Sequence, residues 1–437
     1  MSSRTENRSC FDFSSPRYVR AFLYHREDDE KAHLLFRDGV RYTKRSRAYN
    51  KPCKCPSHLV PILGSRTGMA SLGYSFYVGS YSKKMGHVDG KGKGVALVRL
   101  LPSGDMTLEG SAPPTDVGVN PTYLCFDGTT KVLYVVNECD RGRVAAYSQT
   151  DSETGALTLL CELPSRGKDP CYVEVFDSSA GKLLLVANYS SGSTVFYRLD
   201  DQGKISNFSF HEHTMTSKGP NVARQEAPHA HMAKGFGANK DRVLVPDLGT
   251  DKILSFQLPA MSLVDSGGFQ MKPGDGPRHL EFHPSLKFVY ILSELACTVT
   301  VVQCDLETGD LREPVQVVST LLDGFDNSDG SNTCAHVQLH PSGKFLYVSN
   351  RGGKDHSCTL FHVAEDGSSL TFMENNRVIA EGELCPRAFN ITPDGLWMVV
   401  AYQDTSRLVS FRIDQDTGAC NIASKLEVPT PVCIAWC

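Results

Sequence analysis

The sequence predicts an all-β fold, a seven-bladed β-propeller, from a strand pair that recurs along the chain and from complementary fragments at both ends of the repeated region. Each repeat begins with Pro, or with Cys334 in one case. It continues as a short apolar strand and a turn, and ends as a second apolar strand that closes on polar residues. The spacing of about 50 residues is that of a four-stranded propeller blade. The six repeats span residues 121–138, 170–189, 228–247, 277–294, 334–351 and 386–403.

The fragments at the two ends raise the number of blades to seven. Residues 76–81 fit a second strand that lacks a first, and residues 431–436 fit a first strand that lacks a second. We expect the two fragments to pair in one shared blade. That pairing closes the ring and removes two exposed sheet edges.

The outer strands of the blades are predicted between the repeats. Residues 144–147 and 298–302 consist of Ala, Val, Thr and Tyr and fit third strands. Turns of the pattern Asp-Xaa-Xaa-Thr-Gly at 305–309 and 414–418 separate such strands from the fourth strands.

The composition suits an all-β repeat protein. The 437 residues include 37 Gly and 23 Pro, spread along the chain as many tight turns require. No apolar run reaches 18 residues and the first residues lack an apolar core, so we expect neither a membrane span nor a signal peptide. The 15 Cys follow no regular spacing, and we expect buried thiols, no disulfide framework and a cytoplasmic location.

Residues 1–70 do not share the repeat and are predicted to be a basic, disordered extension of a propeller that occupies residues 71–437. Up to Gly68 there are 14 Lys and Arg against 7 Asp and Glu, a net charge of +7, which leaves −11 for the rest of a chain whose total is −4. A targeting tail or a nucleic-acid arm is the alternative interpretation of the extension. The acidic body argues against nucleic acid as the main partner. Cys53 and Cys55 are a weak metal signal, because no second pair accompanies them.

Polar residues recur where each inner strand begins and where each second strand ends. Because the two strands are antiparallel, both positions should surround one mouth of the central channel. Asn137, Asn188, Asp247 and Asn350 are the ones most readily explained as structural groups that cap turns or bind strand-end amides. The inner strands contribute His229, His231, Arg278, His279, His336 and Arg387, and the second strands contribute Glu138, Asn188, Asp247, Glu294, Asn350, Arg351 and Gln403.

This set of residues indicates acid–base chemistry on a small anion. Guanidinium groups hold carboxylate or phosphate through paired hydrogen bonds, and neighbouring Glu and His supply proton transfer. The sequence contains no P-loop, no dinucleotide fingerprint, no His-Glu-Xaa-Xaa-His motif and no Gly-Xaa-Ser-Xaa-Gly motif. We therefore expect a reaction that needs no cofactor and no metal.

At these residues the chain resembles the seven-bladed propeller lactonases, which comprise propeller-type 6-phosphogluconolactonases and carboxy-cis,cis-muconate cyclases. The resemblance covers residues 74–436, and the N-terminal extension has no counterpart in the family. The matching motifs, in order, are YVGSY at 77–81, ANYSSGS at 187–193, APHAH at 227–231, VPDLGTD at 245–251, GPRHL at 276–280, SEL at 293–295, SNRG at 349–352 and CPR at 385–387.

The resemblance implies an active site formed by one of two histidines, two arginines and a glutamate. These are His229 or His231, Arg278, Glu294 and Arg351. The rest of the mouth is expected to bind substrate. Those neighbouring residues are Glu138, Asn188, His279, His336, Arg387 and Gln403.

The leading hypothesis is hydrolysis of 6-phosphoglucono-δ-lactone in the pentose phosphate route. Arg278 and Arg351 would bind the anion or the oxyanion, Glu294 would activate water, and His229 or His231 would protonate the leaving alkoxide. The alternatives are a cyclase acting on a muconate-type dicarboxylate, a propeller that binds without catalysis, and a calcium-dependent lactonase. The few carboxylates among several Arg make a poor calcium site. The sequence carries no signal for an oligomeric state.

Overall fold

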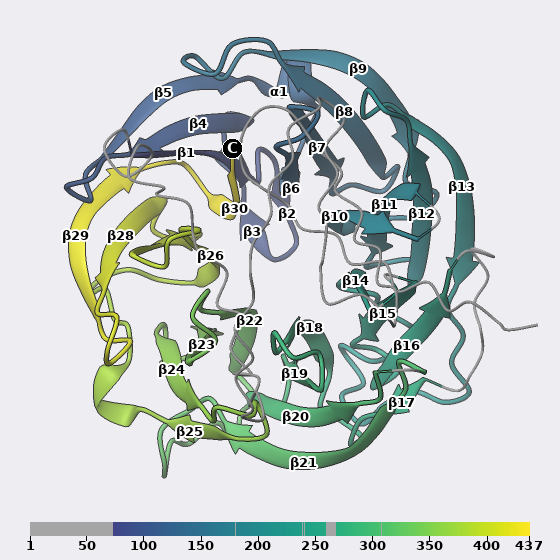
Figure 1. Ribbon diagram of the computed structural model, residues 1–437, viewed down its shortest axis with the longest axis vertical. Coiled ribbons are helices and arrows are strands. Elements are labelled where there is room, and N and C mark those ends of the chain that lie inside the picture. The colour runs from purple at the N-terminus through teal and green to yellow at the C-terminus, as the bar shows by residue number, and fades with distance from the viewer. Residues whose placement is uncertain (1–72, 180, 238, 240, 259–267, 307) are drawn as a thin grey trace, which may run out of the picture. The chain divides into compact units, whose positions relative to one another are not determined.

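The computed structural model describes residues 73–437, apart from residues 180, 238, 240, 259–267 and 307. The extension predicted for residues 1–70, with Cys53 and Cys55, lies outside the described residues. Residues 73–437 form seven four-stranded antiparallel sheets arranged as a ring, so the predicted seven-bladed propeller is confirmed (Figure 1).

Each blade takes four strands that are neighbours in the sheet. Blade 1 contains β30 (Pro431–Trp436), β1 (Tyr74–Ser80), β4 (Val95–Leu100) and β5 (Met106–Ala112). Blade 2 contains β6 (Pro121–Asp127), β7 (Val132–Asn137), β8 (Arg143–Gln149) and β9 (Leu157–Pro164). Blade 3 contains β10 (Pro170–Ser178), β11 (Gly181–Asn188), β12 (Ser193–Leu199) and β13 (Ile205–Glu212), and blade 4 contains β14 (Lys234–Phe236), β15 (Arg242–Asp247), β16 (Lys252–Gln257) and β17 (Phe269–Gln270).

The remaining three blades follow the same order. Blade 5 contains β18 (Pro277–Phe282), β19 (Phe288–Ser293), β20 (Thr298–Cys304) and β21 (Leu311–Ser319). Blade 6 contains β22 (Asn332–Leu339), β23 (Phe345–Gly352), β24 (Cys358–Val363) and β25 (Leu370–Phe372). Blade 7 contains β26 (Pro386–Ile391), β27 (Trp397–Tyr402), β28 (Arg407–Ile413) and β29 (Cys420–Glu427). A small hairpin of β2 (Lys84–Met85) and β3 (Val88–Asp89), the short helix α1 (Pro114–Val117) and the 3₁₀ helix η1 (Glu374–Asn376) complete the elements.

The two ends of the repeat region close the ring, as predicted. Strand β30 pairs antiparallel with β1, and Ser80 lies opposite Pro431 while Phe76 lies opposite Trp436. The C-terminal strand thereby becomes the innermost strand of blade 1. The predicted third strands lie within β8 and β20, and the turn at 414–418 joins β28 to β29.

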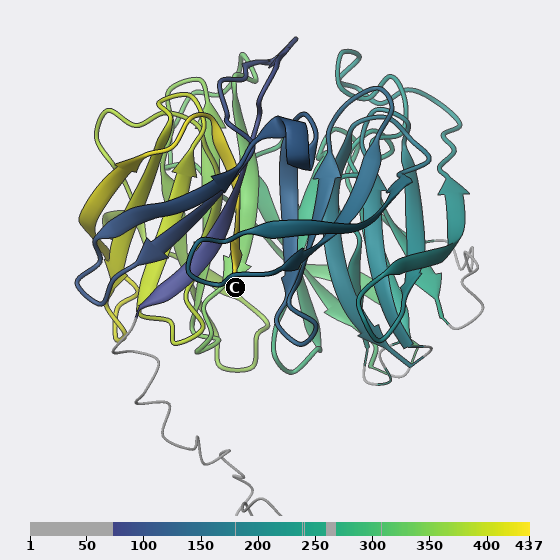
Figure 2. The same ribbon diagram turned by 90° about the horizontal axis from the view of Figure 1, so that it is seen from above.

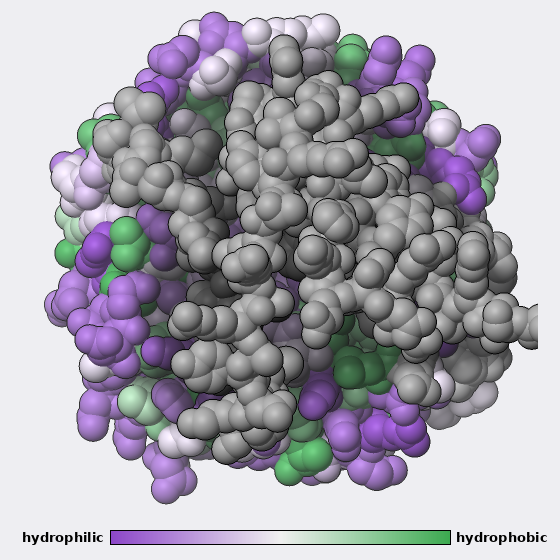
Figure 3. All heavy atoms as spheres, in the orientation of Figure 1, coloured by the Kyte–Doolittle hydropathy of each residue, from purple (hydrophilic) through white to green (hydrophobic). Residues whose placement is uncertain are grey.

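The burial pattern explains why these residues form sheets that stack around a ring. All six residues of β7 and of β27 are buried, because a middle strand of a blade is covered by neighbouring blades on both faces. The outermost strands, such as β21 and β29, mostly alternate between partly buried and exposed residues. On the face in Figure 3 the described residues along the rim are mostly hydrophilic.

Inner and second strands of a blade meet at one mouth of the channel. The first Pro of an inner strand lies opposite the end of the second strand, so the predicted convergence of these positions is present. The pairs are Pro121 with Asn137, Pro170 with Asn188, Pro277 with Ser293 and Pro386 with Tyr402. In Figure 2 the hairpin β2–β3 stands above the upper face of the ring, while the C-terminus lies at the lower face.

Blade 4 departs from the expected pattern. Residues 228–231 were expected to begin an inner strand, but β14 starts only at Lys234, and Ala230 makes an isolated bridge to Asp247. The physical reason is that the amide of His229 donates to the carboxylate of Asp247 at 2.9 Å instead of to a carbonyl group of the sheet. The segment still pairs with the end of β15, because the His231 amide donates to the Pro246 carbonyl at 3.1 Å and the Leu248 amide to the His229 carbonyl at 3.0 Å.

Neighbouring blades are joined by a repeated tyrosine hydrogen bond. The buried phenol on the second strand of one blade donates to a glycine carbonyl in the turn between the third and fourth strands of the next blade. The pairs are Tyr134 with Gly203 at 2.7 Å, Tyr290 with Gly367 at 2.9 Å and Tyr347 with Gly418 at 2.7 Å. A buried carbonyl that loses such a donor costs about 1–3 kcal/mol.

Tyr347→Phe is therefore expected to lower the free energy of unfolding by about 1–2 kcal/mol, because the ring remains packed while the Gly418 carbonyl loses its donor. Thermal melting of the wild type and the variant measures the change. Tyr134→Phe and Tyr290→Phe should give losses of similar size. Unchanged melting in all three variants would show that this contact does not stabilise the ring.

Candidate active site

A repeated backbone device positions the side chains at the mouth. In five blades the residue before the inner-strand Pro has a left-handed conformation, with φ between 48° and 59°, and its carbonyl accepts the amide of a residue that follows the second strand. The five accepting carbonyls belong to Thr430, Asn120, Asp169, Gly276 and Cys385, and the amides come from Tyr81, Glu138, Tyr189, Glu294 and Gln403 respectively. Left-handed backbone is unfavourable for Thr and Cys, so the surrounding structure enforces it.

A β-bulge follows immediately and turns one more residue of each inner strand inward. The register shifts directly after Pro121, Pro170, Pro277 and Pro386. Bulges redirect side chains next to active sites. The redirected residues Thr122, Cys171, Arg278 and Arg387 line a cavity of about 10 Å³ together with Tyr123, Glu138, His231, His279, Ala388 and Val432.

Glu294 is the centre of one side of the mouth. Its carboxylate is 1% exposed and pairs with three guanidinium groups. Arg224 lies at 2.8 Å and Arg351 at 3.2 Å from Oε1, and Arg278 Nε lies 2.9 Å from Oε2. The Arg278 contact has ion-pair distance but lacks the alignment of a hydrogen bond, because neither atom has a hydrogen-bond partner.

The charges around Glu294 decide its protonation. Burial alone would raise the pKa of its carboxyl, but the positive charges of Arg351, Arg224 and Arg278 outweigh burial and hold the pKa well below its ordinary value. Burial, reinforced by the charge of Arg351, lowers the pKa of Arg278 to about 10. The guanidinium of Arg278 also donates to the carbonyl of Ala335 in blade 6. One anionic carboxylate therefore organises three cations.

Arg224 was not among the residues predicted from the sequence. It lies in the connection between β13 and β14, outside every repeated position, and it reaches both Glu294 and the hydroxyl of Tyr189, at 3.0 Å. The side chain of the adjacent Gln225 is buried and donates to the Leu248 carbonyl at 3.0 Å, which anchors this connection. The position carries no periodic signal, so only the folded chain reveals it.

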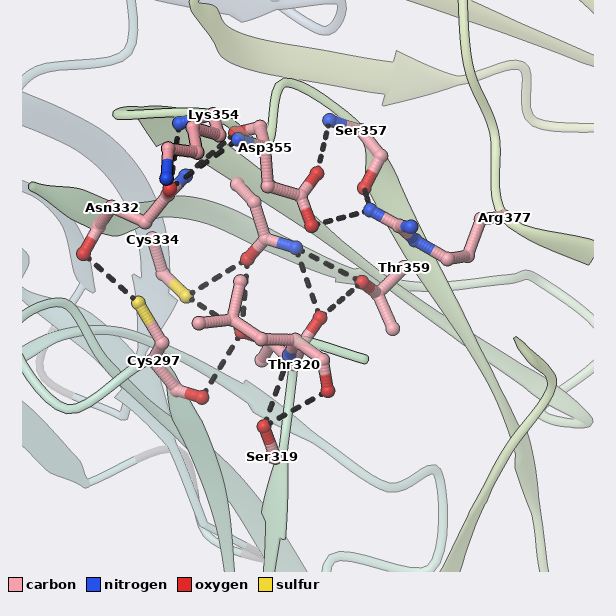
Figure 4. A network of polar contacts seen from close by, with 12 residues as sticks. Cys297, Ser319, Thr320, Asn332, Cys334, Lys354, Asp355, Ser357, Thr359 and Arg377 are labelled. Carbon is pink, nitrogen blue, oxygen red and sulfur yellow. Dashed lines mark hydrogen bonds and ion pairs between the residues drawn. The ribbon is translucent and has the colours of Figure 1, made fainter. Parts of the chain in front are cut away.

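Figure 4 shows a polar network that includes Thr320, Asn332 and Asp355. Through Asn350 and Gly352 this network holds the backbone on both sides of Arg351. Asn350 donates to the carbonyl of Thr320 at 3.0 Å and accepts from the Thr320 hydroxyl at 2.9 Å. Asn332 donates to the carbonyls of Gly352 and Asp355, each at 2.8 Å. Asn350 is fully buried and serves this structural purpose, as expected from the sequence.

Two of the predicted histidines lie beside Tyr189. The ring of His229 stacks on Tyr189 with centroids 4.5 Å apart, and its nitrogens contact the Tyr189 carbonyl at 3.1 Å and the Glu226 carboxylate at 3.2 Å. His231 lies edge-on to Tyr189, with Nδ1 3.7 Å from the sulfur of Cys171. Burial and the charge of Arg278 lower the pKa of His231 well below its ordinary value, so this ring is neutral.

Asp247, at the end of β15, and His213, directly after β13, form a buried pair. His213 Nδ1 lies 2.6 Å from Asp247 Oδ2, and the other carboxylate oxygen accepts the amides of His229 and Thr250. Burial raises the pKa of Asp247, but its contacts with His213 and these amides hold the pKa below its ordinary value. The structural role expected for Asp247 fits these contacts, whereas His213 had no sequence signal.

A second carboxyl, Glu138, lies on the other side of the mouth and is 6% exposed. Tyr81 donates to Oε1 at 2.7 Å and Thr122 donates to Oε2 at 2.8 Å. Arg387 donates to the Tyr81 hydroxyl at 2.9 Å and to Gln403 at 3.4 Å. Glu138, Arg387 and Gln403, predicted separately, thus lie close together around Tyr81, which the prediction did not include as a site residue.

The hairpin β2–β3 adds a histidine to this side of the mouth. Figure 1 places the hairpin over the channel, and His87 Nε2 lies 3.2 Å from the Tyr81 hydroxyl. Burial within the field of Arg387, Arg351 and Arg224 lowers the pKa of His87 to about 4, although the side chain is still open to solvent. Charges from both sides of the mouth therefore act on His87.

The remaining predicted substrate-binding residues are His279, His336 and Asn188, and of these only His279 lines the cavity. His279 lines the channel cavity and contacts the half-buried His336 at 3.2 Å between their Nδ1 atoms, and burial lowers the pKa of His336 to about 3. Asn188 is fully buried and donates to the Ser165 carbonyl at 2.9 Å, so its contacts are structural.

The described part of residues 73–437 contains neither a cluster of side chains suited to a metal ion nor a helix suited to span a membrane. No group of three or more His, Cys, Asp or Glu side chains has the arrangement to hold a metal ion. No helix in this part of the chain is long and apolar enough to cross a membrane. The cysteines of this part, twelve in number, are all free.

Comparisons with known proteins agree with the fold. The family model for the lactonases with a 7-bladed β-propeller matches residues 75–436. A 6-phosphogluconolactonase of Bacillus subtilis (strain 168) is 37% identical over 320 residues, which cover 72% of this chain and 87% of the relative. A 6-phosphogluconolactonase of Formosa agariphila is 31% identical over 308 residues, which cover 69% of this chain and 83% of the relative. The solved periplasmic gluconolactonase of Pseudomonas aeruginosa is 26% identical with a TM-score of 0.71, covering 83% of this chain and 98% of that one.

Glu294→Gln is expected to lower the free energy of unfolding at neutral pH by about 3 kcal/mol, because three buried or half-buried Arg lose their common counter-charge. A carboxyl with a depressed folded-state pKa stabilises the fold fully above its unfolded pKa of about 4.3 and loses that contribution as the pH falls toward the folded-state value. The difference between wild type and variant should therefore shrink below about pH 4.

Denaturant unfolding at a series of pH values measures this difference. Glu427→Gln is a matched control, because its pair with Arg407 at 3.3 Å is exposed and should contribute less than about 1 kcal/mol. Equal effects of the two substitutions at neutral pH would contradict the central role of Glu294.

Proposed function

Because the chain belongs to the seven-bladed β-propeller lactonase family, we propose that it hydrolyses 6-phosphoglucono-δ-lactone to 6-phosphogluconate. The observation that carries this substrate is the group of Arg224, Arg278 and Arg351 around one carboxylate at the mouth. Three guanidinium groups and one carboxylate leave an excess of positive charge, which suits a phosphorylated substrate. Two relatives that share about a third of their residues with the chain bear the name 6-phosphogluconolactonase.

In this proposal the arginines bind the phosphate and stabilise the oxyanion of the tetrahedral intermediate. The excess charge at the buried mouth is fixed before substrate arrives, so little reorganisation accompanies the reaction. Glu294 holds the three guanidinium groups in place. The role of general base that the sequence suggested for Glu294 stays a prediction, and its ion pairs argue against it, since a strongly stabilised anion is a weak base.

His229 fits the general acid better than His231 does. Its two nitrogens face the Tyr189 carbonyl and the Glu226 carboxylate, which accept hydrogen bonds. Both contacts are hydrogen bonds together only when the ring carries a hydrogen on each nitrogen. The hydrogen on Nε2 passes to the alkoxide that leaves when the lactone ring opens, once the substrate displaces the contact with the exposed Glu226.

A muconate-type cyclase is the second candidate, because arginines that hold a phosphate can also hold a dicarboxylate. A propeller that binds such an anion without turnover, and a lactonase that depends on calcium, remain the other hypotheses from the sequence. We also propose a cytoplasmic location, supported by the free cysteines, and a separate basic extension at residues 1–70.

The direct test follows the opening of freshly prepared 6-phosphoglucono-δ-lactone, coupled to 6-phosphogluconate dehydrogenase, with the spontaneous reaction subtracted. Wild-type protein should accelerate the opening, and Arg351→Ala should lose more activity on this substrate than on unphosphorylated glucono-δ-lactone if Arg351 binds the phosphate. The assay is repeated with chelator and with a muconate panel. No acceleration of lactone opening, combined with turnover of a muconate, would replace the proposal by the cyclase.

The choice between the two histidines is tested by His229→Asn and His231→Asn. We expect His229→Asn to lower kcat on the order of 10²-fold or more and His231→Asn to have a smaller effect, because only His229 is held by two acceptors. Single-turnover rates measure the chemical step. The reverse ranking would assign the acid to His231.

A further inference from the structure

Glu138 is a buried carboxyl whose hydrogen bonds come from neutral groups. Its oxygens accept from the Tyr81 phenol at 2.7 Å and from the Thr122 hydroxyl at 2.8 Å, and it makes no ion pair with any residue that the structure describes. The backbone device described above fixes its position, since its amide donates to the Asn120 carbonyl at 3.0 Å. The carboxyl group is therefore held in one orientation without a positively charged partner in direct contact.

The two carboxyls of the mouth have opposite electrostatic environments. Glu294 contacts three guanidinium groups, which stabilise its anion. Burial raises the pKa of Glu138, and the more distant charge of Arg387 and the two hydrogen bonds lower it only in part, so the net shift is upward. A pair of carboxyls separated in this way is the usual basis for two different roles in one site.

Glu138 also lines the cavity at the centre of the channel. This cavity of about 10 Å³ lies among Glu138, Thr122, His231, Arg278 and Arg387, and it links the two sides of the mouth because Arg278 belongs to the Glu294 cluster. The volume is about the least that holds one water molecule, and the polar groups around it can hydrogen-bond that water. The carboxyl is thus adjacent to a site suited to a single water.

We propose that Glu138 is the general base of the lactonase reaction, holding a water molecule in this cavity and taking its proton as the water oxygen attacks the lactone carbonyl. The water forms the new C–O bond, and its proton goes to Glu138. The bond between the carbonyl carbon and the ring oxygen then breaks, and the ring oxygen leaves as an alcohol with a proton from His229. Loss of the proton from Glu138 to solvent and reprotonation of His229 from solvent restore the site. The inference rests on the proposed function.

Charged and titratable groups from several elements act on Glu138, and the pH dependence must be read with all of them in place. Tyr81, Asp169, Cys171 and Arg387 act on it from blades 1, 3 and 7, and His231, Arg278 and His279 face it across the cavity. Removing the Thr122 hydroxyl changes only a neutral donor to the carboxylate. Thr122→Val should raise the pKa of Glu138, because the lost hydrogen bond stabilised the ionised form.

The test compares Glu138→Gln, Thr122→Val and the control Glu174→Gln on the full chain. Glu174 is the control, because it is a half-buried glutamate that accepts a hydrogen bond from a tyrosine, Tyr172 at 2.5 Å, as Glu138 does from Tyr81, yet it lies on the inner strand β10, within 4.0 Å of Lys234, and does not line the cavity. Glu138→Gln should lower kcat on the order of 10²-fold or more with little change in KM. In Thr122→Val, the pH at which kcat/KM declines on the acid side should be higher than in wild type by about one pH unit. Glu174→Gln should do neither.

Each result decides the proposal. Glu138→Gln within threefold of wild type, or a low-pH limb unmoved by Thr122→Val, overturns it. A variant that loses activity because it fails to fold is recognised by its melting curve, and Thr122→Val then carries the test.

The structural readout separates this inference from the proposed function. A crystal structure of the wild type should show an ordered water within hydrogen-bond distance of the Glu138 carboxylate, whatever the substrate. A cavity without that water overturns the inference even if the lactone is opened. The kinetic comparison uses whichever lactone the wild type opens, so failure on 6-phosphoglucono-δ-lactone alone counts against the proposed substrate and leaves Glu138 to be judged on the others.

Discussion

The site depends on one backbone interaction that recurs around the ring. A left-handed residue before the inner-strand proline offers its carbonyl to the amide at the end of the second strand, and a bulge follows at once. The hydrogen bond between this carbonyl and amide fixes the positions of five residues, which are Tyr81, Glu138, Tyr189, Glu294 and Gln403. The bulge turns the side chains of Arg278 and Arg387 inward. Conformations that Thr430 and Cys385 adopt at a cost persist because the closed ring and the packed blades enforce them.

The ring brings charged side chains together at a buried mouth, where the charge of the nearest neighbours strongly affects a carboxyl group. The pKa values of Glu294 and Glu138 differ for this reason. Glu294 is buried but meets three arginines, so its anion is stabilised. Glu138 is buried to a similar degree but meets only a phenol and a hydroxyl, so burial dominates. Similar geometry in two blades thus produces different acidity, because the neighbouring side chains differ in charge.

Much of the fold follows from periodicity, and the exceptions have local causes. The strand pairs, the closure by residues 431–436 and the meeting of strand ends at one mouth were all predictable, since each rests on a pattern along the chain. The late start of β14 was not, because it arises when the His229 amide turns to the Asp247 side chain. Arg224, His213 and His87 were missed for a related reason, as they lie in connections outside the repeat.

The sequence by itself determined the number of blades, the way the ring closes and which repeated positions share the mouth. These follow from the alternation of apolar strands and turns, a property of the chain that requires no knowledge of neighbours. Only the tertiary structure decided which carboxyl is paired with cations, which histidine has two acceptors, and which side chains enclose the central cavity. Those properties depend on distances of a few ångströms between residues from different blades, and electrostatic energy in a buried site varies strongly over such distances.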